Sequence, residues 1–269
     1  MKDYLGKNCD NLLSKKLVLL DMDGTIYLEN SLFDGVTQYL DNIKNSGGRY
    51  VFITNNPTKS SRDYRLKLEK MGITDLTDDN FYTSVQASIA LFLEKFGNKL
   101  IYAQGTKSFI TQLKEGGLNV TEEFNPDICA VLVAFDTELT AEKLRTTCKT
   151  LTLCDVPYYA TNPDWVCPVE FGYIPDCGSM CVGIKYATGK EPIFIGKPLP
   201  TMVQTVMKKF NVNQEDTVVI GDRLYTDIAC GNNAGVDTVC VLSGEATMQD
   251  IQESEVKPTY VLQSIKDLV

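Results

Sequence analysis

The stretch LVLLDMDGT, residues 17–25, joins a short apolar run to two closely spaced acids. Leu17 to Leu20 has the length and composition of a buried strand. Asp21 and Asp23 follow it, with a single residue between them. Two carboxylates at the end of a buried strand repel each other, and burying them is costly unless a positive charge lies between them. The stretch therefore predicts a site that holds a cation.

Short apolar runs alternate with segments of helical periodicity along the rest of the chain. Strands are expected at residues 17–20, 49–54, 99–103, 128–134, 157–160, 192–196, 217–221, 237–243 and 259–262. Helices are expected at residues 33–46, 57–71, 84–96, 106–116, 140–153, 199–210 and 225–234, the second of them opened by Pro57. This alternation predicts an α/β fold, a doubly wound parallel sheet with helices on both faces.

Four of the expected strands end in polar residues. These are Asp21 with Asp23, Thr54 with Asn55 and Asn56, Lys197 after Gly196, and Asp222 after Gly221. Ligands of an open parallel sheet bind at the carboxyl ends of its strands, so we expect the four groups to meet in one crevice. Residues 84–185 lie between the second and third groups and carry no such group, which predicts an insertion.

Asp21, Asp23 and Asp222 would offer only oxygen ligands, which favours Mg²⁺. An EF-hand loop is a rival interpretation of DMDG. It fails because Thr25 would stand at the third ligand position, Ile26 at the glycine position, and no glutamate at the last position. A surface turn rich in Asp and Gly explains DMDGT alone, but it does not explain the other three groups.

Lys197 and the Thr54–Asn55 pair each have two interpretations. Lys197 can hold a phosphoryl oxygen and offset the repulsion between Asp21 and an anionic substrate, or it can be a solvated surface lysine. Thr54 and Asn55 offer a hydroxyl and backbone amides just before a helix start, which suits an anion. An ordinary helix cap with Pro57 behind it is the alternative.

Histidine is absent from the 269 residues. Its absence excludes Ser-His-Asp and Cys-His catalysis, histidine phosphoenzymes and zinc sites built on histidine. No Cys is followed six positions later by Arg, and no glycine-rich stretch ends in Gly-Lys-Ser/Thr, so neither a cysteine-phosphatase loop nor a P-loop is present. The net charge of −9 argues against a nucleic acid polymer or an acidic membrane as partner, but not against a small phosphate ester.

The longest uninterrupted apolar run, residues 128–135, is far shorter than the roughly 20 residues of a membrane helix. No long apolar segment precedes the first strand, so we expect no secretory signal. The nine cysteines have no disulfide-framework spacing, which adds to the expectation of a soluble, cytoplasmic protein. Cys177 and Cys181 can share a helix face, and buried packing is favoured there over a metal site or a redox pair.

The motifs LLDMDGT, FITNN, IGKP and IGDRLYTDI, in that order, resemble the four ordered motifs of the haloacid dehalogenase superfamily of phosphohydrolases. ATNPD, GKPLPTM, GDRLYTDIACGNNAG and VLSG resemble its NagD and 4-nitrophenylphosphatase-like branch, subfamily IIA. The resemblance implies a Rossmann-like catalytic core at residues 1–83 and 186–269, with an α/β cap of the C2 type inserted at residues 84–185. Such a cap covers the crevice and influences substrate choice, and an exposed cap can form a homodimer.

The resemblance implies a Mg²⁺-dependent phosphomonoester hydrolase. Asp21 would be the nucleophile that forms an aspartyl-phosphate, and Asp23 the general acid and base. Mg²⁺ would be held by the carboxylates of Asp21 and Asp222 and the backbone carbonyl of Asp23. The phosphoryl group would be bound by Thr54, Asn55, Asn56 and Lys197, and Asp227 would orient Lys197 or the water around the metal.

The expected substrates are small phosphate esters: nucleoside monophosphates, sugar phosphates, phosphoglycolate or 4-nitrophenyl phosphate. One alternative is a phosphotransferase or mutase that passes the phosphoryl group to another alcohol, and another is a non-catalytic small-molecule sensor. Residues 162–180 of the cap are expected to contact the leaving group, with Asp164, Trp165 and Asp176 as candidates. Packing inside the cap is an equal interpretation of Trp165.

Overall fold

The computed structural model describes residues 1–169 and 171–269, which divide into two compact units. The core unit comprises Met1–Thr54, Ser61–Tyr82 and Lys197–Val269, and the inserted unit comprises Asn55–Ser60 and Thr83–Gly196. The chain therefore passes from one unit to the other directly after Thr54 and directly before Lys197. That the core and the cap fold as separate domains at residues 83/84 and 185/186 stays a prediction.

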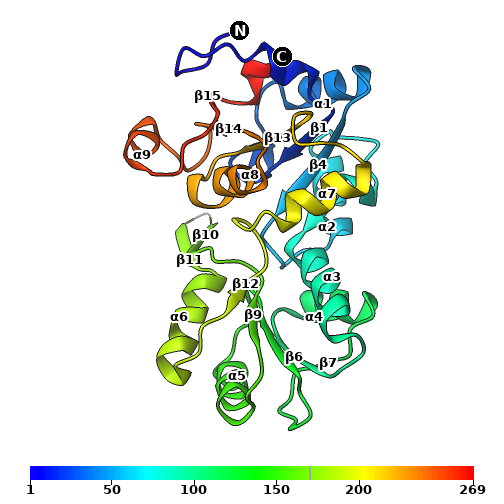
Figure 1. The fold of residues 1–269 in the computed structure, drawn as a ribbon, viewed down its shortest axis with the longest axis vertical. Helices are drawn as coiled ribbons and strands as arrows, with labels where there is room; N and C mark the ends of the chain where they lie inside the picture. Colours follow the sequence, from blue (N-terminus) through cyan, green and yellow to red (C-terminus); the bar gives the residue numbers. More distant parts are fainter. Residues whose placement is uncertain (170) are drawn as a thin grey trace. The chain divides into compact units, whose positions relative to one another are not determined.

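A six-stranded sheet lies at the centre of the core unit, in the order β15-β14-β13-β1-β4-β5 (Figure 1). Its strands are β1 (Leu17–Leu20), β4 (Arg49–Thr54), β5 (Phe81–Thr83), β13 (Thr217–Gly221), β14 (Asp237–Val241) and β15 (Tyr260–Leu262). β1 runs parallel to β4 and β13, with Leu20 beside Phe52 and Ile220. This register brings the residues that follow β1 and β13 to the same edge of the sheet.

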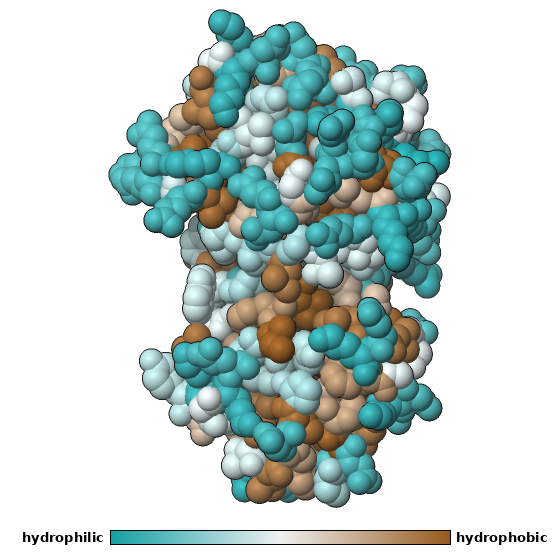
Figure 2. Space-filling view, in the orientation of Figure 1, coloured by the Kyte–Doolittle hydropathy of each residue, from teal (hydrophilic) through white to brown (hydrophobic). Residues whose placement is uncertain are grey.

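The core sheet has an apolar cluster on each face. Val239 and Val241 of β14 pack in one cluster with residues of α1 (Val36–Asn45) and α2 (Ser61–Lys70). Cys240, between them, packs in a second cluster with residues of α9 (Met248–Glu253). Because successive side chains of a strand point to opposite faces, the sheet is covered on both sides, as a doubly wound fold requires. Figure 2 shows mostly hydrophilic residues on the visible face of this unit.

The remaining elements of the core unit lie close to the motifs. α7 (Thr201–Phe210) follows Lys197, and a π-helical turn, Leu224–Ile228, leads into α8 (Ala229–Ala234). The short strands β2 (Tyr27–Leu28) and β3 (Ser31–Leu32) pair directly after the DMDGT stretch. No helix in the described part of the chain is long and apolar enough to cross a membrane.

The inserted unit contains a second sheet, in the order β12-β9-β8-β6-β7 with parallel pairs, drawn mostly in green in Figure 1. Its strands are β6 (Ile101–Gln104), β7 (Val120–Thr121), β8 (Ala130–Val133), β9 (Tyr158–Ala160) and β12 (Ile193–Phe194). Its helices are α3 (Ser84–Phe96), α4 (Lys107–Glu115), α5 (Ala141–Leu153) and α6 (Cys177–Thr188). A side chain that accepts a backbone N–H begins each helix, in order Thr83, Thr106, Thr140 and Asp176. An antiparallel hairpin, β10 (Val166–Val169) and β11 (Gly172–Pro175), precedes α6.

The α/β class with a core sheet and an inserted sheet is confirmed, and two local predictions are wrong. The expected strand at residues 192–196 is shorter, and it pairs with β9 of the inserted sheet, so Lys197 does not follow a strand of the core sheet. The helix expected from Pro57 begins at Ser61. The Asn56 side chain accepts hydrogen bonds from the N–H and hydroxyl of Thr58, and this local turn occupies the preceding residues.

Candidate active site

Lys197 joins two carboxylates in the core unit. Its Nζ lies 2.6 Å from Asp21 Oδ1 and 2.6 Å from Asp227 Oδ1, and it donates to the carbonyl oxygen of Ile53 in β4 at 3.3 Å. The Lys197 side chain is 3% exposed and that of Asp21 is 14% exposed. Burial alone would lower the pKa of Lys197, but the charges of Asp21 and Asp227 raise it above its ordinary value. The ammonium group therefore stays charged between the two carboxylates.

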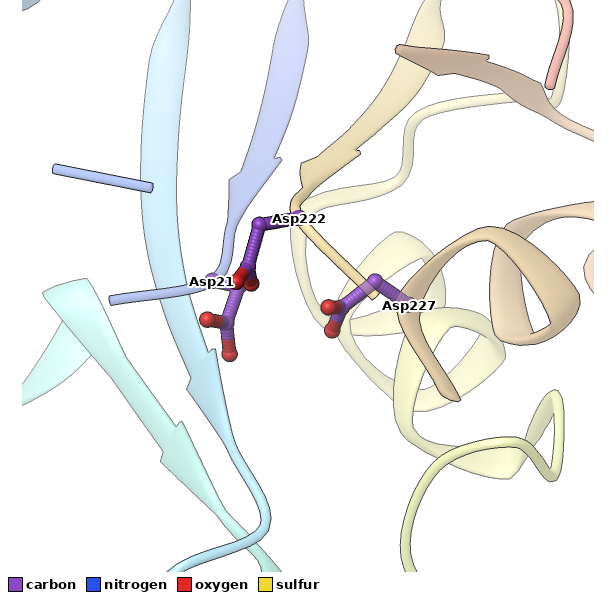
Figure 3. Close-up of side chains that lie close together, drawn as sticks. All are labelled: Asp21, Asp222 and Asp227. Carbon is purple, nitrogen blue, oxygen red and sulfur yellow. The ribbon is translucent and has the colours of Figure 1, made fainter. Parts of the chain in front are cut away.

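Asp21, Asp222 and Asp227 form a group of three carboxylates. Each offers an oxygen that lies within 4.8 Å of the others, and Figure 3 shows the side chains converging from the end of β1, the end of β13 and the π-helical turn. Asp222 Oδ2 accepts the backbone N–H of Glu245 at 2.8 Å, whereas Oδ1 is buried and accepts no hydrogen bond from any described residue. Buried oxygens are normally partnered, so the group fits a cation that Oδ1 would coordinate.

Glycines hold the carboxylates in place. A Cβ on Gly24 or Gly244 would lie 2.3 or 2.0 Å from Asp222 Oδ2, so the two loops can approach this carboxylate only without side chains. Gly24 also has φ +83°, which favours glycine. A Cβ on Gly221 would lie 2.3 Å from the Cβ of Asp227. The glycines of the DGT, GD and SG motifs are therefore required by the carboxylate group.

Charge repulsion at the group is large when no cation is present. Burial, then the charge of Asp227, raises the pKa of Asp222 to about 7, opposed by Arg223. Burial and the same Asp227 charge raise the pKa of Asp21 well above its ordinary value, although Lys197 opposes this. Oxygen-only donors with an unfavourable excess of negative charge are the setting that a hard divalent cation stabilises.

The side chain of Asp23 has different partners from the three carboxylates. Its side chain is 46% exposed, and Tyr27 donates its hydroxyl to Asp23 Oδ2 at 3.0 Å. Lys67 Nζ lies 4.0 Å from Asp23 Oδ1. Neither Tyr27 nor Lys67 was predicted from the sequence. The position of Tyr27 four residues after Asp23 is a visible signal, whereas Lys67 comes from α2 and is brought there only by the fold.

The second motif spans the change from the core unit to the inserted unit. Thr54 ends β4 and is 5% exposed. Asn55 donates its side-chain amide to Asp164 Oδ2 at 2.8 Å, and its carbonyl accepts the hydroxyl of Ser84 at 2.7 Å. Asn56 forms the turn with Thr58 described above. The binding of a phosphoryl group by Thr54, Asn55 and Asn56 stays a prediction.

The three cap candidates differ in exposure. Asp164 is 2% exposed and accepts the side-chain amides of Asn55 and Asn162. Asp176 caps α6 and also accepts from Asn162 at 2.9 Å. Both have structural partners in the inserted unit, whereas Trp165 is 56% exposed. Of residues 162–180, Glu170 lies outside the described residues.

The cysteine pair agrees with the favoured interpretation of buried packing. The Sγ atoms of Cys177 and Cys181 lie 4.0 Å apart, and both residues belong to the apolar cluster of the inserted unit.

Comparisons with known proteins give the family. A model described as haloacid dehalogenase-like hydrolase matches residues 18–119, and a HAD-hydrolase-like model matches residues 194–268. The acid sugar phosphatase of Staphylococcus haemolyticus is 33% identical over 100% of this chain and 95% of its own. The ribonucleotide monophosphatase NagD of Escherichia coli is 30% identical over 94% of this chain and 98% of its own.

Two solved structures share the fold over nearly the whole chain. The 4-nitrophenylphosphatase of Thermotoga maritima superposes with a TM-score of 0.90 at 37% identity, covering 97% of this chain and 98% of that one. The glycerol phosphate phosphatase of Mycobacterium tuberculosis, solved in complex with magnesium, gives 0.88 at 26% identity, covering 100% and 78%.

The motifs, the two parallel sheets and these matches define the class: the chain belongs to the haloacid dehalogenase-like hydrolases. Within that class it belongs to the NagD and 4-nitrophenylphosphatase family, subfamily IIA. It is an enzyme, a phosphatase of small phosphate esters.

Proposed function

We propose that the protein is a Mg²⁺-dependent phosphomonoesterase that acts through an aspartyl-phosphate on Asp21. The observation that carries the proposal is the buried Asp21–Lys197–Asp227 array beside Asp222, whose Oδ1 has no donor among the described residues. The relatives named for sugar phosphates, ribonucleotides and 4-nitrophenyl phosphate support small phosphate monoesters as substrates. The magnesium complex of the mycobacterial relative supports the choice of metal.

Each residue then has a defined task. Lys197 holds Asp21 Oδ1, which favours the ionised form of Asp21 against the effects of burial and Asp227, and leaves Oδ2 to attack phosphorus as the bond to the leaving oxygen breaks. Asp23 gives a proton to that oxygen and later takes one from the water that hydrolyses the aspartyl-phosphate. Asp227 orients Lys197, while Thr54, Asn55 and Asn56 bind phosphoryl oxygens. Asp21, Asp222 and the Asp23 carbonyl would hold Mg²⁺, which would supply positive charge against the phosphoryl oxygens.

Replacement of the nucleophile tests the proposal. Asp21→Asn should lower phosphate release from a panel of sugar phosphates, nucleoside monophosphates, phosphoglycolate and 4-nitrophenyl phosphate by at least about 1000-fold, because the covalent step is lost. Asp155→Asn is the matched control, since the Asp155 side chain is fully exposed and pairs only with Lys190 among the described residues. Retention of more than about a tenth of the wild-type turnover by Asp21→Asn would contradict the proposal.

A further inference from the structure

We infer that Tyr27 and Lys67 are positioning residues for Asp23, a role that rests on the proposed function because it takes Asp23 as the general acid. Tyr27 donates its hydroxyl to Asp23 Oδ2 at 3.0 Å, and Lys67 Nζ lies 4.0 Å from Asp23 Oδ1. Lys67 Nζ also lies 3.6 Å from the centroid of the Tyr27 ring. One oxygen of the Asp23 carboxylate thus lies near Tyr27 and the other near Lys67, although the Asp23 side chain is 46% exposed.

An exposed aspartate needs such support. A general acid must lie within about 2.6–3.2 Å of the leaving oxygen, and a free side chain divides its time among several rotamers. Tyr27 can hold the Asp23 side chain in one position because Tyr27 is fully buried in the apolar cluster that contains Leu20 and Tyr64. Gly24 N also donates to the Tyr27 carbonyl at 2.8 Å, which closes the loop from Asp23 to Tyr27. The Tyr27 hydroxyl is therefore anchored through both ring and backbone.

The Tyr27 hydroxyl acts as a hydrogen-bond donor and not as a second acid or base. Burial, followed by the charge of Asp23, raises the pKa of Tyr27 far above its ordinary value, so the phenol keeps its proton across the working range of an enzyme. Lys67 stabilises the same arrangement in two ways: its ammonium lies over the ring face, a cation–π contact, and it attracts the Asp23 carboxylate.

The two acids of the DMDG stretch thus have separate cationic partners. Lys197 pairs with Asp21, and Lys67 lies beside Asp23. Loss of the Tyr27 hydroxyl should consequently impair proton transfer to the leaving oxygen without affecting the nucleophile. A variant that loses only proton transfer should therefore be slower on some esters than on others, whereas a general loss of structure would slow all esters alike.

The test compares two leaving groups in Tyr27→Phe, which keeps the buried ring. An alkyl ester such as glycerol phosphate needs protonation of its leaving oxygen, whereas 4-nitrophenolate leaves without it. General acid catalysis contributes about 100-fold to 10,000-fold, so we expect kcat/KM for the alkyl ester to fall about 10-fold to 100-fold in Tyr27→Phe. For 4-nitrophenyl phosphate we expect a change below about threefold. Tyr39→Phe is the matched control, because Tyr39 belongs to the same cluster and its buried hydroxyl has no partner among the described residues.

Variants of Lys67 and Asp23 complete the test. Lys67→Met should show the same selective loss of kcat/KM for the alkyl ester, and Lys67→Arg should lose less because it keeps the positive charge. In an Asp23→Asn background, Tyr27→Phe should cause no additional loss of kcat/KM. Equal losses on both esters, or no loss on either, in Tyr27→Phe would overturn the inference. If Tyr27→Phe does not fold, Lys67→Met decides by the same comparison. Wild-type rates on the alkyl ester in Asp23→Asn would instead refute the acid role of Asp23, and with it the proposed function.

Discussion

Replacement of Asp222 by Asn should stabilise the metal-free protein and greatly reduce its stabilisation by Mg²⁺. Asp222 is 3% exposed, its Oδ1 has no donor among the described residues, and its ionised form is repelled by Asp227. Asn has the same shape and still accepts the N–H of Glu245 through its side-chain oxygen. The substitution therefore removes a buried charge without opening a cavity.

The size of the stability gain follows from the pKa of Asp222. This pKa is about 7 in the folded protein and 3.8 for an ordinary aspartate. The folded protein binds this proton more tightly than the unfolded chain, so the stability that the group contributes is complete below about pH 4 and is lost as the pH rises towards 7. A pKa difference of about 3 corresponds to at most about 4 kcal/mol. The stability gained in Asp222→Asn should grow from about 1 kcal/mol at about pH 4.5 to an upper limit of about 4 kcal/mol at about pH 8.

Urea unfolding in EDTA, at both pH values and with Mg²⁺ added back, measures this effect. Wild type should gain about 2.7 kcal/mol at a Mg²⁺ concentration 100 times its Kd, and Asp222→Asn much less. Asp155→Asn, which alters a fully exposed carboxylate, should show neither effect. A metal-free Asp222→Asn protein that is less stable than wild type at about pH 8, or a gain independent of pH, would refute the reasoning.

Two further substitutions test the packing of the site. Gly244→Ala places a Cβ 2.0 Å from Asp222 Oδ2 and should displace this carboxylate. The Mg²⁺ affinity, measured by titrating the activity with Mg²⁺, should therefore fall about 10-fold to 100-fold. Gly183→Ala is the control and should leave the Mg²⁺ affinity unchanged, because the space around its Cβ is open. Lys197→Met leaves Asp21 and Asp227 without their shared cation and should cost about 3–5 kcal/mol in urea unfolding. Lys209→Met removes the exposed pair with Asp79 and should cost less than about 1 kcal/mol, and equal costs for the two lysines would contradict the role of burial.

The sequence predicted the core of the fold because its signals are local. The apolar runs at residues 17–20 and 217–221 coincide with β1 and β13, and the polar residues after them lie at one edge of the sheet. The hairpin β10–β11 and the helix α9 were not predicted, and the only sign of α6 was that Cys177 and Cys181 can share a helix face. α9 has six residues, and α6 contains two glycines, so neither gives a strong helical pattern.

Contacts between distant segments limited the prediction of the site. Lys197 was expected at the end of a core strand, yet it follows β12 of the inserted sheet and reaches Asp21 through a 2.6 Å ion pair. The prediction rested on its position after an expected strand and on the IGKP motif, and the strand proved to belong to the inserted sheet. Lys67 gave no such signal, because the sequence does not distinguish one lysine of a charged helix such as α2 from another, and only the fold places Lys67 over the Tyr27 ring.

The pair of acids in the DMDG stretch shows why chemistry depends on surroundings as well as on residue type. Asp21 is largely buried and bound to Lys197 within a group of carboxylates, an environment suited to a nucleophile that lies beside a cation. Asp23, two residues later, is 46% exposed and accepts a hydrogen bond from Tyr27, an environment unlike that of Asp21. Neighbouring carboxylates acquire separate roles when their environments differ in this way. The sequence places the two acids together, and the turn through Gly24 to Tyr27 gives Asp23 a hydrogen-bond donor of its own.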